Sequence, residues 1–180
     1  LAFPWPSSIP VTLVIKSING ERHEKECNRL KNKIGGDSRI LQIHEVLPHS
    51  INTALMKCCD CYVSLHRSEG FGLTLAEAML MGKPVITTGY SGNMDFTTSA
   101  TALLVDYELV PVQPGDYPFS HGEMWAEPNV QQASDYMLDL VEDSTFAQSL
   151  AQKGEEMIRT SFSTTTMGDR YKKRLSNLLK

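Results

Sequence analysis

Short apolar segments alternate with segments of helical pattern along this chain. The apolar segments, bounded by turn residues, are residues 11–20, 39–47, 61–66, 83–88 and 101–106. Parallel strands must be joined by long crossovers, usually helices, so this alternation predicts an α/β fold with a parallel sheet flanked by helices. Such sheets bind ligands at the carboxyl ends of their strands. We therefore expect a site in the loops that follow the strands.

Helical patterns separate and follow these strands. Besides an apolar helix within residues 68–84, the predicted helices are residues 21–36, 50–60, 129–143, 144–162 and 166–180. We expect the two glycines at the end of residues 21–36 to stop that helix, Ser50 to be the N-cap of one helix and Pro128 to open another. Their periodicity places Val130, Val141 and Phe146 among the buried residues.

Composition and length describe a globular chain. The 180 residues, 41% of them apolar and 21% charged, fit one domain or one lobe of a larger enzyme. A net charge of −4 gives no electrostatic footprint for nucleic acid. No apolar run reaches the ~18–20 residues of a membrane span, and no signal peptide opens the chain. We expect a single domain over residues 1–180 and, because Leu1 begins it, a piece of a longer cytoplasmic protein.

The cysteines favour reduced thiols over a metal site. Three of the four cysteines crowd into residues 57–61, too close together to suggest a disulfide framework. Cys58 and Cys61 have the spacing of a zinc pair, which His44, His49 or His66 would have to complete. No second pair has zinc spacing, so we expect no metal.

Residues 106–127 show no regular pattern and include several prolines and aromatic residues. A loop longer than ~12–15 residues usually covers a site or is disordered. One interpretation is that Phe119 and Trp125 pack on the domain's own core. The other is that the loop closes over a ligand as a lid.

Residues 68–84, SEGFGLTLAEAMLMGKP, carry two glutamates in an unusual setting. Glu69 precedes a glycine pair, and Glu77 is the only polar residue of an apolar stretch that reads as a helix buried nearly all round. Glu77 could return a hydrogen bond to the helix start in a capping box with Thr74. Alternatively it faces a crevice, where ligand hydroxyls satisfy it. The sequence leaves both interpretations open.

The glycines beside Glu69 indicate a phosphate site. Glycine lets a backbone approach a ligand closely, and amides at a helix N-terminus attract phosphate. A carboxylate there would repel phosphate unless it points toward neutral hydroxyls. The pattern therefore predicts a ligand with phosphates in its middle and hydroxyl-rich groups on either side, as in a nucleotide sugar.

A longer string of residues carries a family resemblance. HRSEGFGLTLAEAMLMGKPVITT, then GYSGNMDF and TALLVD, resembles the donor-binding, C-terminal lobe of retaining GT-B glycosyltransferases of family four (group 1). The resemblance is dense from Cys61 to Asp106 and looser from Val11 to the C-terminus. WAEP at 125–128 is similar to a bacterial-type subgroup. The resemblance implies a Rossmann-like fold.

The resemblance also implies roles for individual residues. Glu69, the residue closest to the chemistry, would bind hydroxyls of the transferred sugar, and Glu77 would bind the ribose. The backbone amides implied to hold the diphosphate are those of Gly70, Phe71, Gly72 and Leu73. The base would lie near residues 44–47. Asp95 stands where many relatives have glutamate.

The basic residues depart from the family pattern. Relatives clamp the diphosphate with an Arg and a Lys just before the first strand, but residues 1–10 contain neither. His66 and Arg67, directly before the glutamate loop, are the better additional candidates. Lys16 and Lys83 are more simply explained as solvated ends of a strand and a helix.

The implied activity is transfer of a hexose to an acceptor hydroxyl with retention of configuration. The donor phosphate would take the acceptor proton, with no metal or other cofactor. The acceptor, a glycan or lipid-linked molecule, would be held by an N-terminal lobe that this chain lacks, so the chain alone would be inactive. We expect a role in polysaccharide or lipopolysaccharide synthesis and peripheral membrane association. The alternatives are a nucleotide-sugar-binding module and another GT-B enzyme such as an epimerase.

Overall fold

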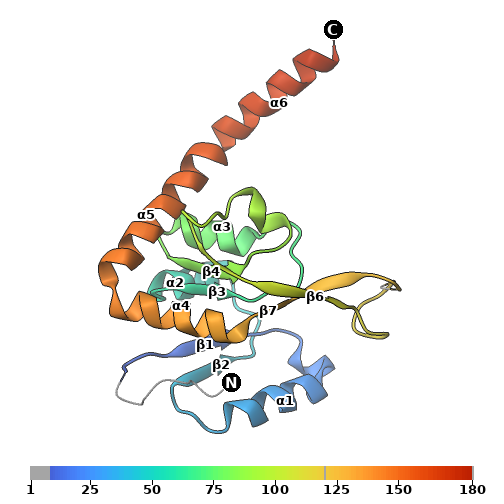
Figure 1. The fold of residues 1–180 in the computed structure, drawn as a ribbon, viewed down its shortest axis with the longest axis vertical. Helices are drawn as coiled ribbons and strands as arrows, with labels where there is room; N and C mark the ends of the chain where they lie inside the picture. The colour runs from blue at the N-terminus through green and yellow to red at the C-terminus, as the bar shows by residue number, and fades with distance from the viewer. Residues whose placement is uncertain (1–8, 120, 180) are drawn as a thin grey trace. The chain divides into compact units, whose positions relative to one another are not determined.

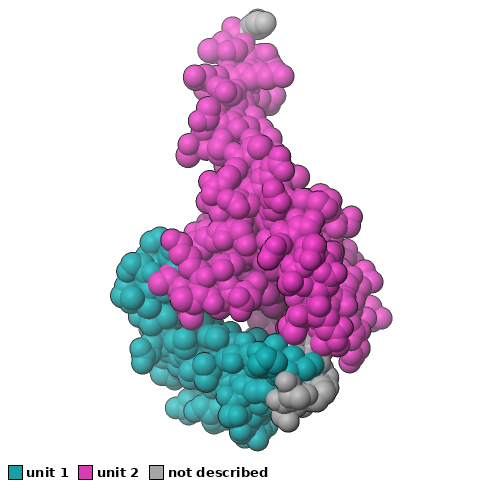
Figure 2. Space-filling view, turned by 90° about the vertical axis from the view of Figure 1, so that its left-hand side faces the viewer, with its two compact units in different colours: residues 1–53 teal, residues 54–180 magenta. Residues whose placement is uncertain are grey.

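The computed structural model describes residues 9–119 and 121–179. The chain forms two compact units, residues 1–53 and 54–180, shown in teal and magenta in Figure 2. The prediction of one domain over residues 1–180 stays a prediction.

The first unit contains a pair of parallel strands. Strand β1 (Leu13–Lys16) pairs with β2 (Ile40–Ile43) from Leu13 opposite Ile40 to Lys16 opposite Ile43. Between them lie the short 3₁₀ turn η1 (Gly20–Arg22) and helix α1 (Glu24–Ile34). Helix α1 ends at Gly35 in the left-handed conformation, with φ 61°, which confirms the predicted glycine stop.

Helix α2 (His49–Cys58) follows these strands. Because the helix already begins at His49, Ser50 lies in its first turn, and the prediction of Ser50 as N-cap is wrong.

The second unit is built on three parallel strands in the order β3-β4-β5 (Figure 1). These are β3 (Tyr62–Ser64), β4 (Val85–Thr88) and β5 (Leu103–Val105). Helix α3 (Leu73–Leu80) connects β3 to β4, and the 3₁₀ turn η2 (Gly92–Asp95) lies between β4 and β5. The predicted α/β fold with parallel strands and flanking helices is confirmed.

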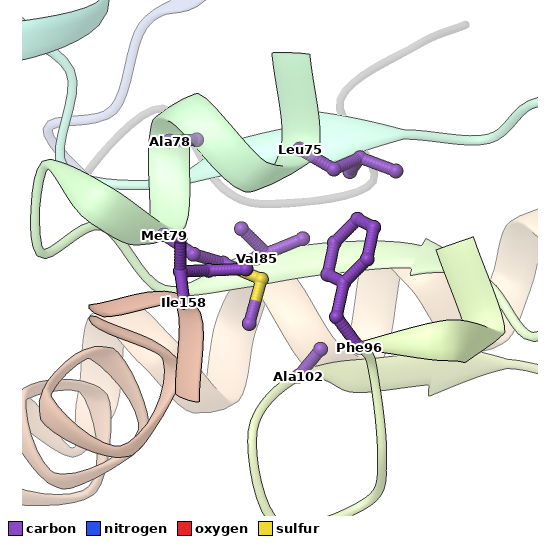
Figure 3. Packing of buried hydrophobic residues seen from close by; sticks show 7 residues of the cluster. All are labelled: Leu75, Ala78, Met79, Val85, Phe96, Ala102 and Ile158. Carbon is purple, nitrogen blue, oxygen red and sulfur yellow. The ribbon is translucent and has the colours of Figure 1, made fainter. Parts of the chain in front are cut away.

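Successive residues of β4 face opposite sides of this sheet, as strand geometry requires. Val85 belongs to the cluster shown in Figure 3, which comprises Leu75, Ala78, Met79, Val85, Phe96, Ala102 and Ile158. Three of its members come from α3, Val85 comes from β4, and Ile158 comes from helix α5 (Ser144–Ser161). Ile86 packs on the other side with Val105 and with Ala133 of helix α4 (Val130–Glu142). The sheet is therefore covered on both faces.

The C-terminal helices differ from the prediction in detail. Asn129, not Pro128, precedes α4, and its side chain caps the helix by accepting from the amide of Gln132. Val130, Val141 and Phe146 are exposed, contrary to the prediction. Helix α6 (Thr164–Leu178) follows α5. Among the residues that the structure describes, no helix is both long and apolar enough to cross a bilayer.

Residues 106–127 are more regular than their sequence suggests. Strands β6 (Tyr107–Pro111) and β7 (Met124–Pro128) form an antiparallel hairpin, and the amide of Val112 donates to the carbonyl of Glu123 beyond them. Prolines end both strands, where a missing N–H is tolerated. Phe119 is wholly exposed, so it does not pack on the core as one interpretation required.

We expect the cluster of Figure 3 to dominate the stability of the second unit. Met79 is fully buried, so Met79→Ala should lower the free energy of unfolding by about 2–5 kcal/mol, measured by urea denaturation. Its neighbour Leu80 is 40% exposed, and Leu80→Ala is the matched control. Equal losses in the two variants would contradict this assignment of the core.

Candidate functional site

The loop that follows β3 is joined to the loop that follows β4. Within the first loop, the carbonyl of Glu69 accepts from Ser91 Oγ at 2.8 Å and from the amide of Gly92 at 3.0 Å. Ser91 Oγ also accepts from the amide of Glu69 at 3.3 Å. On the strand itself, Thr88 Oγ1 donates to the carbonyl of His66 at 2.7 Å. The backbone at Glu69 is thus held in one conformation.

Glycine is required where these loops meet. A Cβ on residue 92 would lie 2.0 Å from the carbonyl oxygen of Gly70, so any side chain at Gly92 would force the loops apart. Gly72, with φ 91°, has a backbone conformation that other residues rarely adopt. A Cβ there would lie 3.0 Å from Leu75 Cδ1 and 3.3 Å from Phe96 Cζ. These glycines are therefore required for the close packing of the loops, in addition to any role in ligand binding.

The first turn of α3 presents free amides. Gly72 occupies the N-cap position without a side-chain cap, and the first helical bond runs from the amide of Ala76 to the carbonyl of Gly72. The amides of residues 70–75 donate no hydrogen bond to another described residue. Because uncapped amides at a helix N-terminus carry partial positive charge, this turn is suited to an anion.

Both glutamates of the motif carry carboxylates without a partner. Neither Glu69 nor Glu77 forms a side-chain hydrogen bond or ion pair within the described residues. Thr74 is already inside the helix, so the proposed capping box does not form. Glu77 is exposed, as are Leu73 (68%) and Leu80 (40%). The expectation of a helix buried nearly all round is therefore wrong, and Glu77 is free to bind a ligand.

Arg67 is occupied by the β6–β7 hairpin. Its guanidinium forms an ion pair with Glu127 and lies 4.6 Å from the centre of the Trp125 ring. Both charged side chains are about half-exposed. The sequence did not indicate this partnership, because it joins residues sixty positions apart.

His66 has buried ring nitrogens. Neither Nδ1 nor Nε2 has a hydrogen-bond partner in the described structure, and the same holds for Oδ1 of buried Asn93. Burial lowers the pKa of His66 from its ordinary value of 6.5, while the nearby Glu69 carboxylate acts in the opposite direction. These groups could bind a ligand or a water.

Of the remaining candidates, Lys83 and His44 have hydrogen-bond partners of their own, and Lys16 and Asp95 are exposed. Lys83 Nζ donates to the carbonyl of Lys57 at 2.7 Å, and Lys16 is the exposed last residue of β1. Asp95 is an exposed residue of η2. His44, near the predicted base site, belongs to the first unit and bonds to Ser17 and Gln42.

The cysteines form no cluster of the kind that binds metal. Within residues 9–119 and 121–179, no group of three or more His, Cys, Asp or Glu side chains could hold an ion. All four cysteines are free thiols. Burial raises the pKa of Cys61 to about 12, so this thiol remains protonated at neutral pH.

Comparison with known proteins identifies the family. The family described as "Glycosyl transferases group 1" matches residues 10–157. No curated protein sequence matches this chain. The chain belongs to the group 1 glycosyltransferases.

Solved structures share the fold. HepE of Anabaena, in complex with UDP-glucose, is 19% identical with a TM-score of 0.69, over 97% of this chain and 43% of its own. The C-terminal domain of LpcC from Francisella tularensis is 22% identical with a TM-score of 0.59, over 81% and 65%. Sucrose-phosphate synthase of Thermosynechococcus elongatus is 18% identical with a TM-score of 0.67, over 94% and 40%.

These likenesses define the architecture. The fold is that of the Rossmann-like C-terminal lobe of a GT-B glycosyltransferase. The chain spans about two fifths of the length of HepE.

The burial of His66 makes stability depend on pH. Between its ordinary pKa and its lower pKa in the folded protein, the unfolded chain binds a proton that the folded chain does not. The free energy of unfolding should therefore fall as the pH falls through that window. In His66→Phe this fall should be smaller, measured by urea denaturation at about pH 7.5 and about pH 5.5. An equally steep fall in the variant would contradict the assignment to His66.

Proposed function

We propose that this chain is the nucleotide-sugar-binding lobe of a retaining glycosyltransferase, which transfers a hexose from a nucleotide-diphosphate sugar to an acceptor hydroxyl. One observation carries the proposal. Along the chain, the unpartnered carboxylates of Glu69 and Glu77 precede and follow a run of backbone amides without acceptors, at residues 70–73. Groups that accept from hydroxyls thus flank groups that donate to phosphate.

The diphosphate is assigned to the amides of Gly70, Phe71, Gly72 and Leu73. Amides fixed in place before the ligand arrives stabilise its charge without reorganisation. Gly70 has nothing within 4 Å of the position where a Cβ would be, which leaves open space for the ligand. The N-terminus of α3 adds its dipole to the attraction. Backbone donors of this kind support binding without a metal or other cofactor.

The carboxylates are assigned to the two ends of the ligand. Glu77 lies on the exposed side of α3 and binds the ribose hydroxyls. Glu69, in the loop before the helix, binds hydroxyls of the transferred sugar and so positions the donor. His66 and Arg67 directly precede this loop and are assigned as further binding residues. The buried ring nitrogens of His66, which lack partners, support that assignment.

Retention of configuration fits this arrangement. In the proposed mechanism the acceptor hydroxyl forms a bond to the anomeric carbon on the face that the diphosphate leaves. The departing phosphate oxygen takes the hydroxyl proton, so no protein nucleophile is needed. Glu69 holds the sugar in place during this exchange and differs from the nucleophile of a two-carboxylate glycosidase.

The acceptor and cellular context follow from the same proposal. The acceptor is a glycan or a lipid-linked molecule bound largely outside this chain, and the protein works in the cytoplasm, peripherally associated with a membrane. WaaG, another neighbour, is involved in lipopolysaccharide biosynthesis and is 17% identical with a TM-score of 0.57. We propose a related role in polysaccharide or lipopolysaccharide synthesis, in a bacterial-type subgroup.

Two isosteric substitutions separate the roles of the glutamates. Glu77→Gln should weaken binding of the nucleotide diphosphate with or without a sugar, whereas Glu69→Gln should weaken only the nucleotide sugar. Loss of a hydrogen bond to a charged group corresponds to ~1.5–3 kcal/mol, or about ten- to a hundredfold in affinity. Calorimetry with a panel of UDP-, GDP-, ADP- and dTDP-sugars and the matching diphosphates measures both effects.

The control for this experiment is Glu156→Gln, at an exposed position on α5. If the wild-type chain binds nothing in the panel, the proposed function is wrong. If both glutamate variants bind the nucleotide sugar and the diphosphate as tightly as the wild type, the assignment of Glu77 to the ribose and of Glu69 to the transferred sugar is wrong.

The 180-residue chain alone should transfer no sugar. This prediction is supported by the length of the chain, which covers only 43% of the HepE chain. Transfer needs an acceptor site as well as a donor site. Incubation with the tightest-binding nucleotide sugar and simple sugar acceptors, followed by mass spectrometry, tests this. A glycosylated acceptor above the level of a sample without protein would show that this chain suffices for catalysis.

A further inference from the structure

The β6–β7 hairpin contacts the loop after β3 through three consecutive residues of β7. The amide of Ala126 donates to the carbonyl of Arg67 at 2.9 Å. On either side of Ala126, Trp125 lies under the Arg67 guanidinium and Glu127 forms its ion pair. Both the backbone and the side chain of Arg67, two positions before Glu69, are therefore fixed by the hairpin.

The other strand of the hairpin contacts the loop after β4. Tyr107 of β6 packs on Tyr90, with ring centres 5.0 Å apart and ring planes inclined at 53°. Tyr90 directly precedes Ser91 and Gly92, whose hydrogen bonds hold the backbone of Glu69. Each strand of the hairpin thus fixes one of the two loops that meet at Glu69.

The base of the hairpin is attached to the rest of its unit. The amide of Asn129 donates to the carbonyl of Asp106 at 2.8 Å. Gln132 of α4 accepts from the amide of Asp106 at 2.6 Å and donates to its carboxylate at 3.1 Å. These bonds close the hairpin where it leaves β5 and returns to α4, so its position relative to the sheet is defined.

The hairpin has little other apolar packing. Among the described residues of its strands only Ala126 is buried, while Leu109 and Met124 are exposed. A half-exposed ion pair such as that of Arg67 and Glu127 contributes little to stability. The contacts of the hairpin are concentrated on the loops of the site rather than on the core.

We propose that the hairpin is a brace for the sugar-binding loop, and that Tyr107, Trp125 and Glu127 are positioning residues that act through Arg67 and Tyr90. The carboxylate of Glu69 has no partner of its own, so the backbone that carries it must set its direction. Fixing that backbone before binding lowers the cost of ordering it around a ligand. This inference rests on the proposed function for its effect on binding, but not for its effect on loop order.

The brace has a specific consequence for affinity. The amides of the first turn of α3 and the carboxylate of Glu77 belong to a helix packed on the core, so they do not depend on the hairpin. Weakening the brace should therefore reduce the additional affinity that a sugar gives to a nucleotide diphosphate. If the hairpin only stabilised the fold, its variants would lower the affinities for the nucleotide sugar and for the diphosphate equally, or would change neither affinity.

The experiment uses Glu127→Gln, Trp125→Leu and Tyr107→Leu in the full chain. Matched controls are Glu123→Gln and Tyr117→Leu, which alter exposed residues between the two strands. Amide hydrogen exchange follows the amides of Glu69 and Gly92, with β4 as the internal reference. Calorimetry then compares the tightest-binding nucleotide sugar of the panel with its nucleotide diphosphate.

We expect faster exchange at Glu69 and Gly92 in the three brace variants, with unchanged exchange in β4. The nucleotide sugar should bind about three- to tenfold more weakly in Trp125→Leu and Tyr107→Leu, the range of one cation–π or aromatic contact. In Glu127→Gln the loss should be about two- to fivefold, the range of a half-exposed ion pair. The diphosphate, which the brace reaches only through Arg67, should show a smaller change. The controls should match the wild type. Because Glu127→Gln is isosteric and half-exposed, it remains informative if Trp125→Leu fails to fold.

Unchanged hydrogen exchange at the amides of both Glu69 and Gly92 would show that the hairpin is not a brace, whatever affinities are measured for the ligands. Faster exchange with unchanged affinity for the nucleotide sugar would overturn its role in binding. If the wild-type chain binds no member of the panel, the proposed function fails, while the exchange measurements still decide whether the hairpin orders the loops.

Discussion

The close approach of two loops, at Gly70 and Gly92, is the constraint on which the rest of the site depends. The 2.0 Å separation between a hypothetical Cβ on residue 92 and the carbonyl oxygen of Gly70 shows that these backbones are in direct contact. That contact lets Ser91 and Gly92 bond to Glu69. Because β3 and β4 are adjacent parallel strands, their following loops emerge side by side, and the sheet itself creates the meeting point.

Around this contact, several polar groups lack the hydrogen-bond partners that such groups usually have in a folded protein. Buried polar groups normally find partners, yet the His66 ring nitrogens and Asn93 Oδ1 have none. The amides at the start of α3 and the nearby carboxylates are likewise unused within the described residues. Meanwhile the helix beneath them is anchored by fully buried Leu75 and Met79. Rigid apolar packing thus supports a surface of unsatisfied polar groups.

The sequence predicted the elements whose signals are local. Apolar strands, the glycine stop of α1 and the helix after Gly72 all follow from periodicity and from residues near each boundary. The hairpin was missed because four of the five β6 residues are exposed, so the strand lacks the alternation that indicates half-burial. The capping box failed because Gly72, with its positive φ, starts the helix before Thr74. The pairing of Arg67 with Glu127 is non-local, and no pattern within either segment indicates it.

The loop after β4 and the tip of the hairpin differ in the amino acid substitutions that they can accommodate. At Gly92 every amino acid replacement adds a side chain where no room exists, so a substitution there must displace the loop that carries Gly70. Residues 112–119 and 121–123, between the two strands, are almost all exposed and lie beyond the contacts made by Tyr107 and Trp125. Insertions and substitutions there would leave the strands paired. The tip can therefore vary in sequence and length without altering the hydrogen bonds that hold the backbone of Glu69.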